Sequence, residues 1–237
     1  MNIFKGAIAV FAASFLVTAA SAQMSEEEMI AFNEQSYFKG EPRITERPAI
    51  DSLTGTVALA ERPDNMMSPP TMSAKTKMIA VQTMMAANPM GLRDMMNFMV
   101  AKKMVLPGIT FDEVIESINS RALDLNMRPT GHNTPYVVLR ETMDENSPRL
   151  EFLSFCDLIT MRMIMDFTLE FGAFLPCSIQ VMEDNTGQIW ITTLDWDVRW
   201  LDGSPNPNRI SDDLRERAIR VRENIESIMD AGATGDF

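Results

Sequence analysis

Histidine and cysteine are almost absent from this chain of 237 residues, which has one histidine, His132, and two cysteines, Cys156 and Cys177. A zinc site with two histidine ligands is therefore excluded, and a Ser-His-Asp triad would have to recruit His132. We interpret residues 130–133 as a turn in which His132 is solvated. Gly-x-Ser-x-Gly, Walker and dinucleotide-binding motifs are also missing. These patterns predict no catalytic residue.

Positive charge is scarce as well. The chain has 21 lysines and arginines against 33 acids, which gives a formal net charge of −12. A partner made of phosphates requires clustered cations, so nucleic acid and an anionic membrane surface are excluded as partners. We expect Asp184, Asp195 and Asp197 to lie in turns or at strand ends, and not to act as paired catalytic carboxylates.

Long apolar runs are confined to the beginning of the chain. Residues 1–22 have Lys5, an apolar run over residues 7–20 and the small-x-small triplet Ala20-Ser21-Ala22. These features predict a signal peptide cleaved after Ala22 and a periplasmic protein with no transmembrane segment. Cleavage would remove Lys5 and leave a net charge of −13. An uncleaved N-terminal anchor remains the alternative.

The rest of the sequence divides into three parts by composition. Residues 23–102 form an extension, in which we expect a short first helix, a Pro-rich break at residues 65–70 and Met-rich helices at residues 73–87 and 89–103. Residues 103–204 form the main domain. Residues 205–237 contain a C-terminal helix, predicted over residues 211–229, and a tail.

The main domain has the pattern of an α+β fold. Thr110 and Glu113 form a capping box at the start of a helix that continues to residue 125. Strands are predicted at residues 104–106, 136–140, 150–155, 179–183 and 188–194. The last two strands flank Asp184-Asn185-Thr186-Gly187, which predicts a hairpin. Cys156 lies where a strand gives way to a helix.

Three motifs in this domain are similar to those of the domain-of-unknown-function 302 family. They are Phe155-Cys156-Asp157, the segment Phe174-Leu175-Pro176-Cys177, and Val181-Met182-Glu183-Asp184 continuing through Gly187 to Ile191-Thr192-Thr193. This chain has Asp157-Leu158 where many members have Asn-Pro. The resemblance covers about residues 103–200. It implies helices packed on one face of an antiparallel sheet and a homodimer, but no activity.

The two cysteines allow several interpretations. In an oxidising compartment a pair predicts a disulfide between Cys156 and Cys177, which can close if the intervening helix ends near Thr168. A reactive pair is the second interpretation, because Cys156 lies at a helix N-terminus, although Asp157 opposes its ionisation. Redox or sulfur-transfer chemistry would then use both thiols. A thiolate and thioether metal site or two buried free thiols are the remaining alternatives.

Methionine is abundant, with 21 residues. Met95 and Met99 are one helical turn apart, as are Met161 and Met165, so thioether pairs could bind Cu(I). The alternative is an apolar core or interface filled by methionine. Trp190, Trp196 and Trp200 are interpreted as core and rim residues.

We therefore predict a periplasmic binding or accessory protein without a cofactor, and the sequence leaves enzymatic activity open. It would bind a partner protein or a second copy through a hydrophobic surface, built by the Met-rich helices and the helix after Cys156. Thiol chemistry and Cu(I) handling remain the alternatives.

Overall fold

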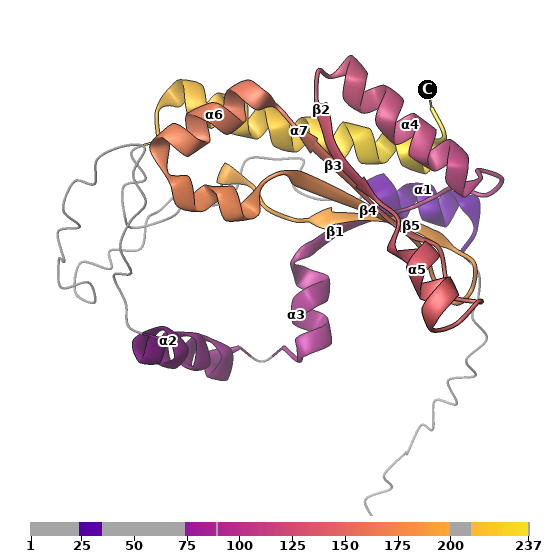
Figure 1. Ribbon diagram of the computed structural model, residues 1–237, viewed down its shortest axis with the longest axis horizontal. Coiled ribbons are helices and arrows are strands. Elements are labelled where there is room, and N and C mark those ends of the chain that lie inside the picture. The colour runs from indigo at the N-terminus through magenta and orange to yellow at the C-terminus, as the bar shows by residue number, and fades with distance from the viewer. Residues whose placement is uncertain (1–23, 35–73, 89, 200–209, 237) are drawn as a thin grey trace, which may run out of the picture.

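The computed structural model describes residues 24–34, 74–88, 90–199 and 210–236 (Figure 1). The predicted signal peptide, the break at residues 65–70 and Trp200 lie outside these residues. The helices are α1 (Glu26–Glu34), α2 (Ala74–Ala87), α3 (Leu92–Phe98), α4 (Phe111–Asp124), α5 (Pro135–Thr142), α6 (Leu158–Phe167), the 3-10 helix η1 (Leu169–Phe174) and α7 (Asp212–Thr234). The strands are β1 (Val100–Met104), β2 (Arg128–Asn133), β3 (Leu150–Cys156), β4 (Cys177–Glu183) and β5 (Ile189–Leu194).

The strands form one antiparallel sheet in the order β1-β5-β4-β3-β2. Along β3, Glu151, Leu153 and Phe155 are buried and alternate with half-buried residues, as expected for a strand with one face on the core. The prediction of an α+β fold with an antiparallel sheet is confirmed.

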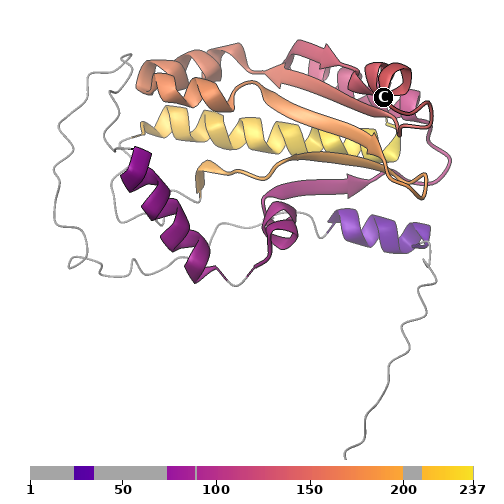
Figure 2. The ribbon, with the colours of Figure 1, turned by 60° about the horizontal axis from the view of Figure 1, so that its bottom comes forward.

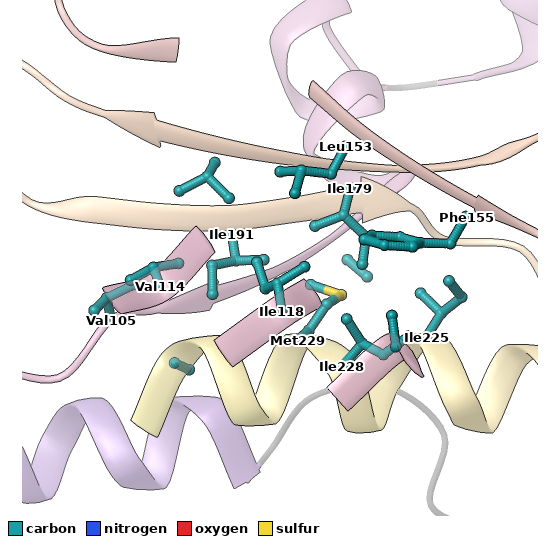
Figure 3. Close-up of a cluster of buried hydrophobic side chains, with 14 of the residues drawn as sticks. Val105, Val114, Ile118, Leu153, Phe155, Ile179, Ile191, Ile225, Ile228 and Met229 are labelled. Atoms are coloured by element: carbon teal, nitrogen blue, oxygen red, sulfur yellow. The ribbon is translucent and has the colours of Figure 1, made fainter. Parts of the chain in front are cut away.

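The core lies between this sheet and the helices α4 and α7. Isoleucines of three elements meet there, with Ile118 on α4, Ile228 on α7 and Ile191 on β5 fully buried (Figure 3). Gly232 on α7 permits this close packing, because an added Cβ would lie 2.7 Å from a carbon of Ile118 and 2.8 Å from a carbon of Ile191. The C-terminal helix is therefore part of the main domain.

Local capping signals locate the helix starts. Thr110 and Glu113 form the predicted capping box at α4. The Ser211 side chain accepts a hydrogen bond from the backbone N–H of Leu214 and begins α7. The predicted strand over residues 150–155 and the hairpin around Asp184 are also confirmed.

The predictions for two neighbouring segments, residues 130–133 and 136–140, were wrong. Residues 136–140, predicted as a strand, belong to α5, which begins with Pro135. Residues 130–133, predicted as a turn, belong to the edge strand β2 and pair with β3 through a bulge between Pro129 and Gly131. A proline at the first helical position favours a helix, while an edge strand tolerates proline and glycine.

The predicted helix over residues 89–103 was wrong at its C-terminal end. It ends at Phe98 as α3, and the following residues form β1. Lys103 is 2% exposed within this strand and pairs with Asp230 on α7. A lysine inside a five-residue strand obscures the alternation that identifies strands.

The helices α1 and α3 lie next to β1, the edge strand of the sheet (Figure 2). The Phe32 ring of α1 contacts the Trp190 indole edge-on, with ring centroids 6.0 Å apart. The Asn33 side chain exchanges two hydrogen bonds with the backbone of Met104 and so covers one end of the β1 edge. Among the described helices, none is long and apolar enough to cross a membrane.

Candidate functional site

The two cysteines are free thiols in the structure. Cys177 is paired across the sheet with Phe155, so Cys156 lies one residue out of register with it. α6 does end at Phe167, as the bridge requires, but the structure does not contain the predicted disulfide.

The surroundings of both thiols favour the protonated form. Burial and a nearby Cys156 raise the pKa of Cys177 to about 11, and Arg222 offsets this only in part. Burial, together with the negative charge of Asp157, also raises the pKa of Cys156. The Asp157 side chain accepts hydrogen bonds from two amides at the start of α6, so it takes the donors that would stabilise a Cys156 thiolate.

The four candidate methionine ligands form two separate pairs. Met95 and Met99 belong to α3 and its C-cap, whereas Met161 and Met165 belong to α6. These helices lie on opposite sides of the sheet (Figures 1 and 2). The thioether of Met165 packs on Gly172 of η1, where an added Cβ would be 3.3 Å from its sulfur. A single four-thioether copper site is therefore not formed.

His132 is on β2 and is held by a carboxylate that sequence reasoning missed. Its Nε2 is 2.6 Å from Oε2 of Glu151, whose side chain is 2% exposed. The other carboxylate oxygen accepts from Arg149, 2.7 Å away. Arg149 also pairs with Asp112 and lies 4.1 Å from the centroid of Phe111 at the start of α4. The sequence did contain a signal for this contact. Glu151 occupies an inward position in the alternation of β3, and a buried carboxylate needs a cationic or hydrogen-bonding partner.

This network fastens three elements to one another. Glu151 uses one oxygen for Arg149 and the other for His132, so both oxygens of this buried carboxylate have a partner. The connection joins β2, β3 and α4, and we interpret it as structural.

Asp195 and Asp197, expected at a strand end, are buried after β5. Asp195 pairs with Arg222 of α7 at 3.0 Å. Asp197 pairs with Arg199, and although burial alone would raise the pKa of Asp197, the hydrogen bonds from Arg199 lower it. The Asp195–Arg222 pair fastens the end of β5 to α7, whereas the Asp197–Arg199 pair is local to the segment that follows β5.

The open face of the sheet has a different character, which follows from the register. Lys102, Thr192 and Gln180 lie side by side on β1, β5 and β4 and form a polar row. Apolar rows flank it on both sides, one formed by Met104, Trp190 and Met182 and the other by Val100 and Leu194.

A cleft of about 480 Å³ lies over these rows, with Met96 and Asn97 of α3 as its wall. Its floor includes Met182, Trp190 and Leu194. The indole N–H of Trp190 donates to Asp184 at 2.8 Å, which holds the ring in the floor. Leu194 is 50% exposed and Met96 is 47% exposed. The cleft has the volume and the mixture of apolar and polar side chains of a small-molecule site.

Comparison with known proteins decides the family. The family described as Domain of unknown function DUF302 matches residues 102–232, more than half of the chain. The chain belongs to the DUF302 family. The earlier resemblance is thereby confirmed, and the DUF302 match extends through most of α7. No curated protein matches the chain.

A solved structure of another DUF302 protein is among the matches. The crystal structure of an uncharacterized conserved DUF302 protein from Bacillus stearothermophilus has a TM-score of 0.45 with this chain and 18% sequence identity. The likeness covers 56% of this chain and 97% of the other. Within the present chain, the DUF302 match contains the floor of the cleft except Val100, which lies two residues before the match. The wall formed by α3 precedes the matched residues.

Proposed function

We propose that this DUF302 protein is an exported binding protein that holds its ligand in the cleft between α3 and the open face of the sheet. Export rests on the leader pattern of residues 1–22. Binding rests on one observation, a cleft of about 480 Å³ with exposed apolar side chains in both its floor and its wall.

The apolar character of the cleft supports a binding role. An antiparallel sheet with one face on the core usually turns polar residues toward water on the other. Here that face carries Met182, Trp190 and Leu194, and α3 adds Met96. Exposed apolar side chains that are gathered in one concave place favour a ligand, whereas scattered ones need no explanation.

Two other functions receive less support. A redox or sulfur-transfer function needs a thiolate near neutral pH, and the raised pKa values of Cys156 and Cys177 oppose it. Copper handling would rest on Met95 and Met99 alone, because the α6 pair is on the other side of the sheet. Two thioethers are a weak ligand set without a third donor.

The test is a titration with N-phenyl-1-naphthylamine, an uncharged probe that fluoresces in apolar surroundings. We expect saturable binding to the purified protein. Leu194→Asp, which introduces a charge into the cleft floor, should weaken binding at least about tenfold. Leu123→Asp is the matched control, because Leu123 is 57% exposed on α4, away from the cleft.

Two outcomes would overturn the proposal. One is the absence of saturable binding to the unaltered protein. The other is an equal loss in the two variants, which would indicate that the probe binds elsewhere.

A further inference from the structure

Trp190 has the largest side chain in the floor of the cleft, and two contacts hold its ring in place. The indole N–H donates a hydrogen bond to Asp184 at 2.8 Å. The Phe32 ring meets the indole edge-on, with ring centroids 6.0 Å apart and an interplanar angle of 86°. Trp190 is half-buried and lines the cleft. A ring that is already fixed loses little side-chain entropy when a ligand binds, so the cleft offers a preorganised aromatic surface.

The methionines near Trp190 also favour an aromatic ligand. Met182 lies directly opposite Trp190 on β4, and Met96, which is 47% exposed, adds a second thioether from the wall. Aromatic pairs gain stability beyond the area that they bury, and sulfur makes favourable contacts with aromatic rings. Leu194 and Val100 also line the cleft, but aliphatic side chains give no such preference. The lining therefore favours an aromatic body over a saturated body of the same size.

Gln180 supplies a polar group near the indole. It is paired with Thr192, two residues after Trp190, so it is the diagonal neighbour of Trp190 across the two strands. Such neighbours lie about 7–8 Å apart. The Thr192 hydroxyl is 3.4 Å from the Gln180 side-chain oxygen. The amide nitrogen of Gln180 has two N–H donors, and no described residue accepts a hydrogen bond from it. An acceptor oxygen a few bonds from an aromatic ring can therefore bind there.

We propose that the ligand is a small aromatic molecule with an acceptor oxygen, whose ring packs on Trp190 and Met182 while the oxygen binds the Gln180 amide. This inference rests on the proposed binding function and adds the class of ligand. The volume of about 480 Å³ fits one such molecule. Lys102 is assigned no ligand contact, since its ammonium donates to Asn97.

The experiment compares 4-phenyl-2-butanone with 4-cyclohexyl-2-butanone, which has a saturated ring, and with butylbenzene, which lacks the oxygen. Each is titrated as a competitor of N-phenyl-1-naphthylamine bound to the full protein. The phenyl ketone should compete about threefold more strongly than the cyclohexyl ketone, because the indole and the two thioethers favour an aromatic ring. A cleft that was merely apolar would give the opposite order, since the saturated ring is the more hydrophobic one.

Trp190→Leu should abolish the preference for the phenyl ketone. Trp196→Leu is the matched control, because the Trp196 ring contacts Phe171 with centroids 5.3 Å apart and does not line the cleft. Gln180→Met, which keeps the size of the side chain, should weaken competition by the phenyl ketone about threefold and leave butylbenzene unchanged. The comparison of the two ketones on the unaltered protein does not depend on the folding of any variant.

Failure of this inference differs from failure of the proposed function. If the probe binds but the cyclohexyl ketone competes as strongly as the phenyl ketone or more strongly, the aromatic proposal alone is overturned. A preference for the phenyl ketone that survives in Trp190→Leu would also overturn it. An equal loss of the ketone and butylbenzene in Gln180→Met would overturn the part assigned to the amide. If the probe does not bind at all, the proposed function fails, and the aromatic proposal fails with it.

Discussion

The rate at which the two cysteines are alkylated tests whether burial raises the pKa of their thiols. The perturbation is treatment of the native protein with iodoacetamide at about pH 8, because the thiolate is the form that reacts. Cys177 is the informative residue. Its pKa is raised by burial from an ordinary 9.0 to about 11, so little of it is ionised under these conditions.

The expected rate follows from the thiolate fraction. At about pH 8, raising the pKa from 9.0 to about 11 lowers the thiolate fraction about 90-fold. Cys177 should therefore react about 90 times more slowly than an ordinary exposed cysteine. Its rate should continue to rise about tenfold per pH unit up to about pH 10. Cys156, which is 2% exposed and also has a raised pKa, should be slow as well.

The assay is intact mass spectrometry at increasing times, with peptide mapping to assign the modified residue. Protein unfolded in urea is the control, and both thiols should then react at the ordinary rate. Native Cys177 reacting within about threefold of the unfolded control would refute the burial argument. Thiols that remain blocked in urea until a reductant is added would instead establish the disulfide that the sequence predicted.

Two further predictions concern stability and are measured by urea denaturation. Glu151→Ala should lower the free energy of unfolding by about 3 kcal/mol, because it removes the two hydrogen bonds of a buried carboxylate, each contributing about 1.5 kcal/mol. Asp112→Ala removes the 83% exposed partner of the same arginine and should cost less than about 1 kcal/mol; equal effects would contradict the argument. Gly232→Ala should destabilise by about 1 kcal/mol, since overpacking of about 2 kcal/mol exceeds the helix-propensity gain of about 1 kcal/mol. Gly172→Ala is the control, because its added Cβ would meet only the flexible Met165 at 3.3 Å, and it should change stability by less than about 0.5 kcal/mol. Equal losses in the two variants would contradict the assignment of the Gly232→Ala loss to overpacking against Ile118.

The elements that could be predicted are those with a local signal. Thr110 and Glu113 begin α4 as the capping box requires, and the alternation around Leu153 identifies β3. The hairpin turn at Asp184 was recognisable because turn residues act within four positions. In each case the chemistry that decides the structure is contained in a short window.

The segment from β2 to α5 could not be predicted in this way. Val137 and Val138 are β-branched and favour a strand, yet they are 40% and 58% exposed on a short helix. β2 has almost no buried side chain, because it is an edge strand and its order comes from backbone pairing with β3. A strand that buries little gives no hydrophobic period to detect.

The site was harder still, because its parts are distant in sequence. Lys102 meets Thr192 through strand register, and Lys103 on the same strand pairs with Asp230 on α7. Composition shows that methionine is abundant, but it does not show which methionines share a face. Met182 and Met96 line the cleft, whereas the pairs chosen by helical spacing are divided between two sides of the sheet.

The floor and the wall of the cleft come from different parts of the chain, because the floor lies mostly within the DUF302 match and the wall lies before it. The DUF302 match begins at residue 102, so the sheet that forms the floor belongs to the shared domain. α3 lies before that match and adds to the cleft lining Met96 and Asn97, the second of which accepts a hydrogen bond from Lys102. A sheet face by itself is too open to hold a small ligand, because binding sites enclose most of the ligand surface. The extension therefore converts a face of the DUF302 sheet into a cleft, and removal of the α3 side chains should weaken ligand binding more than it affects the fold.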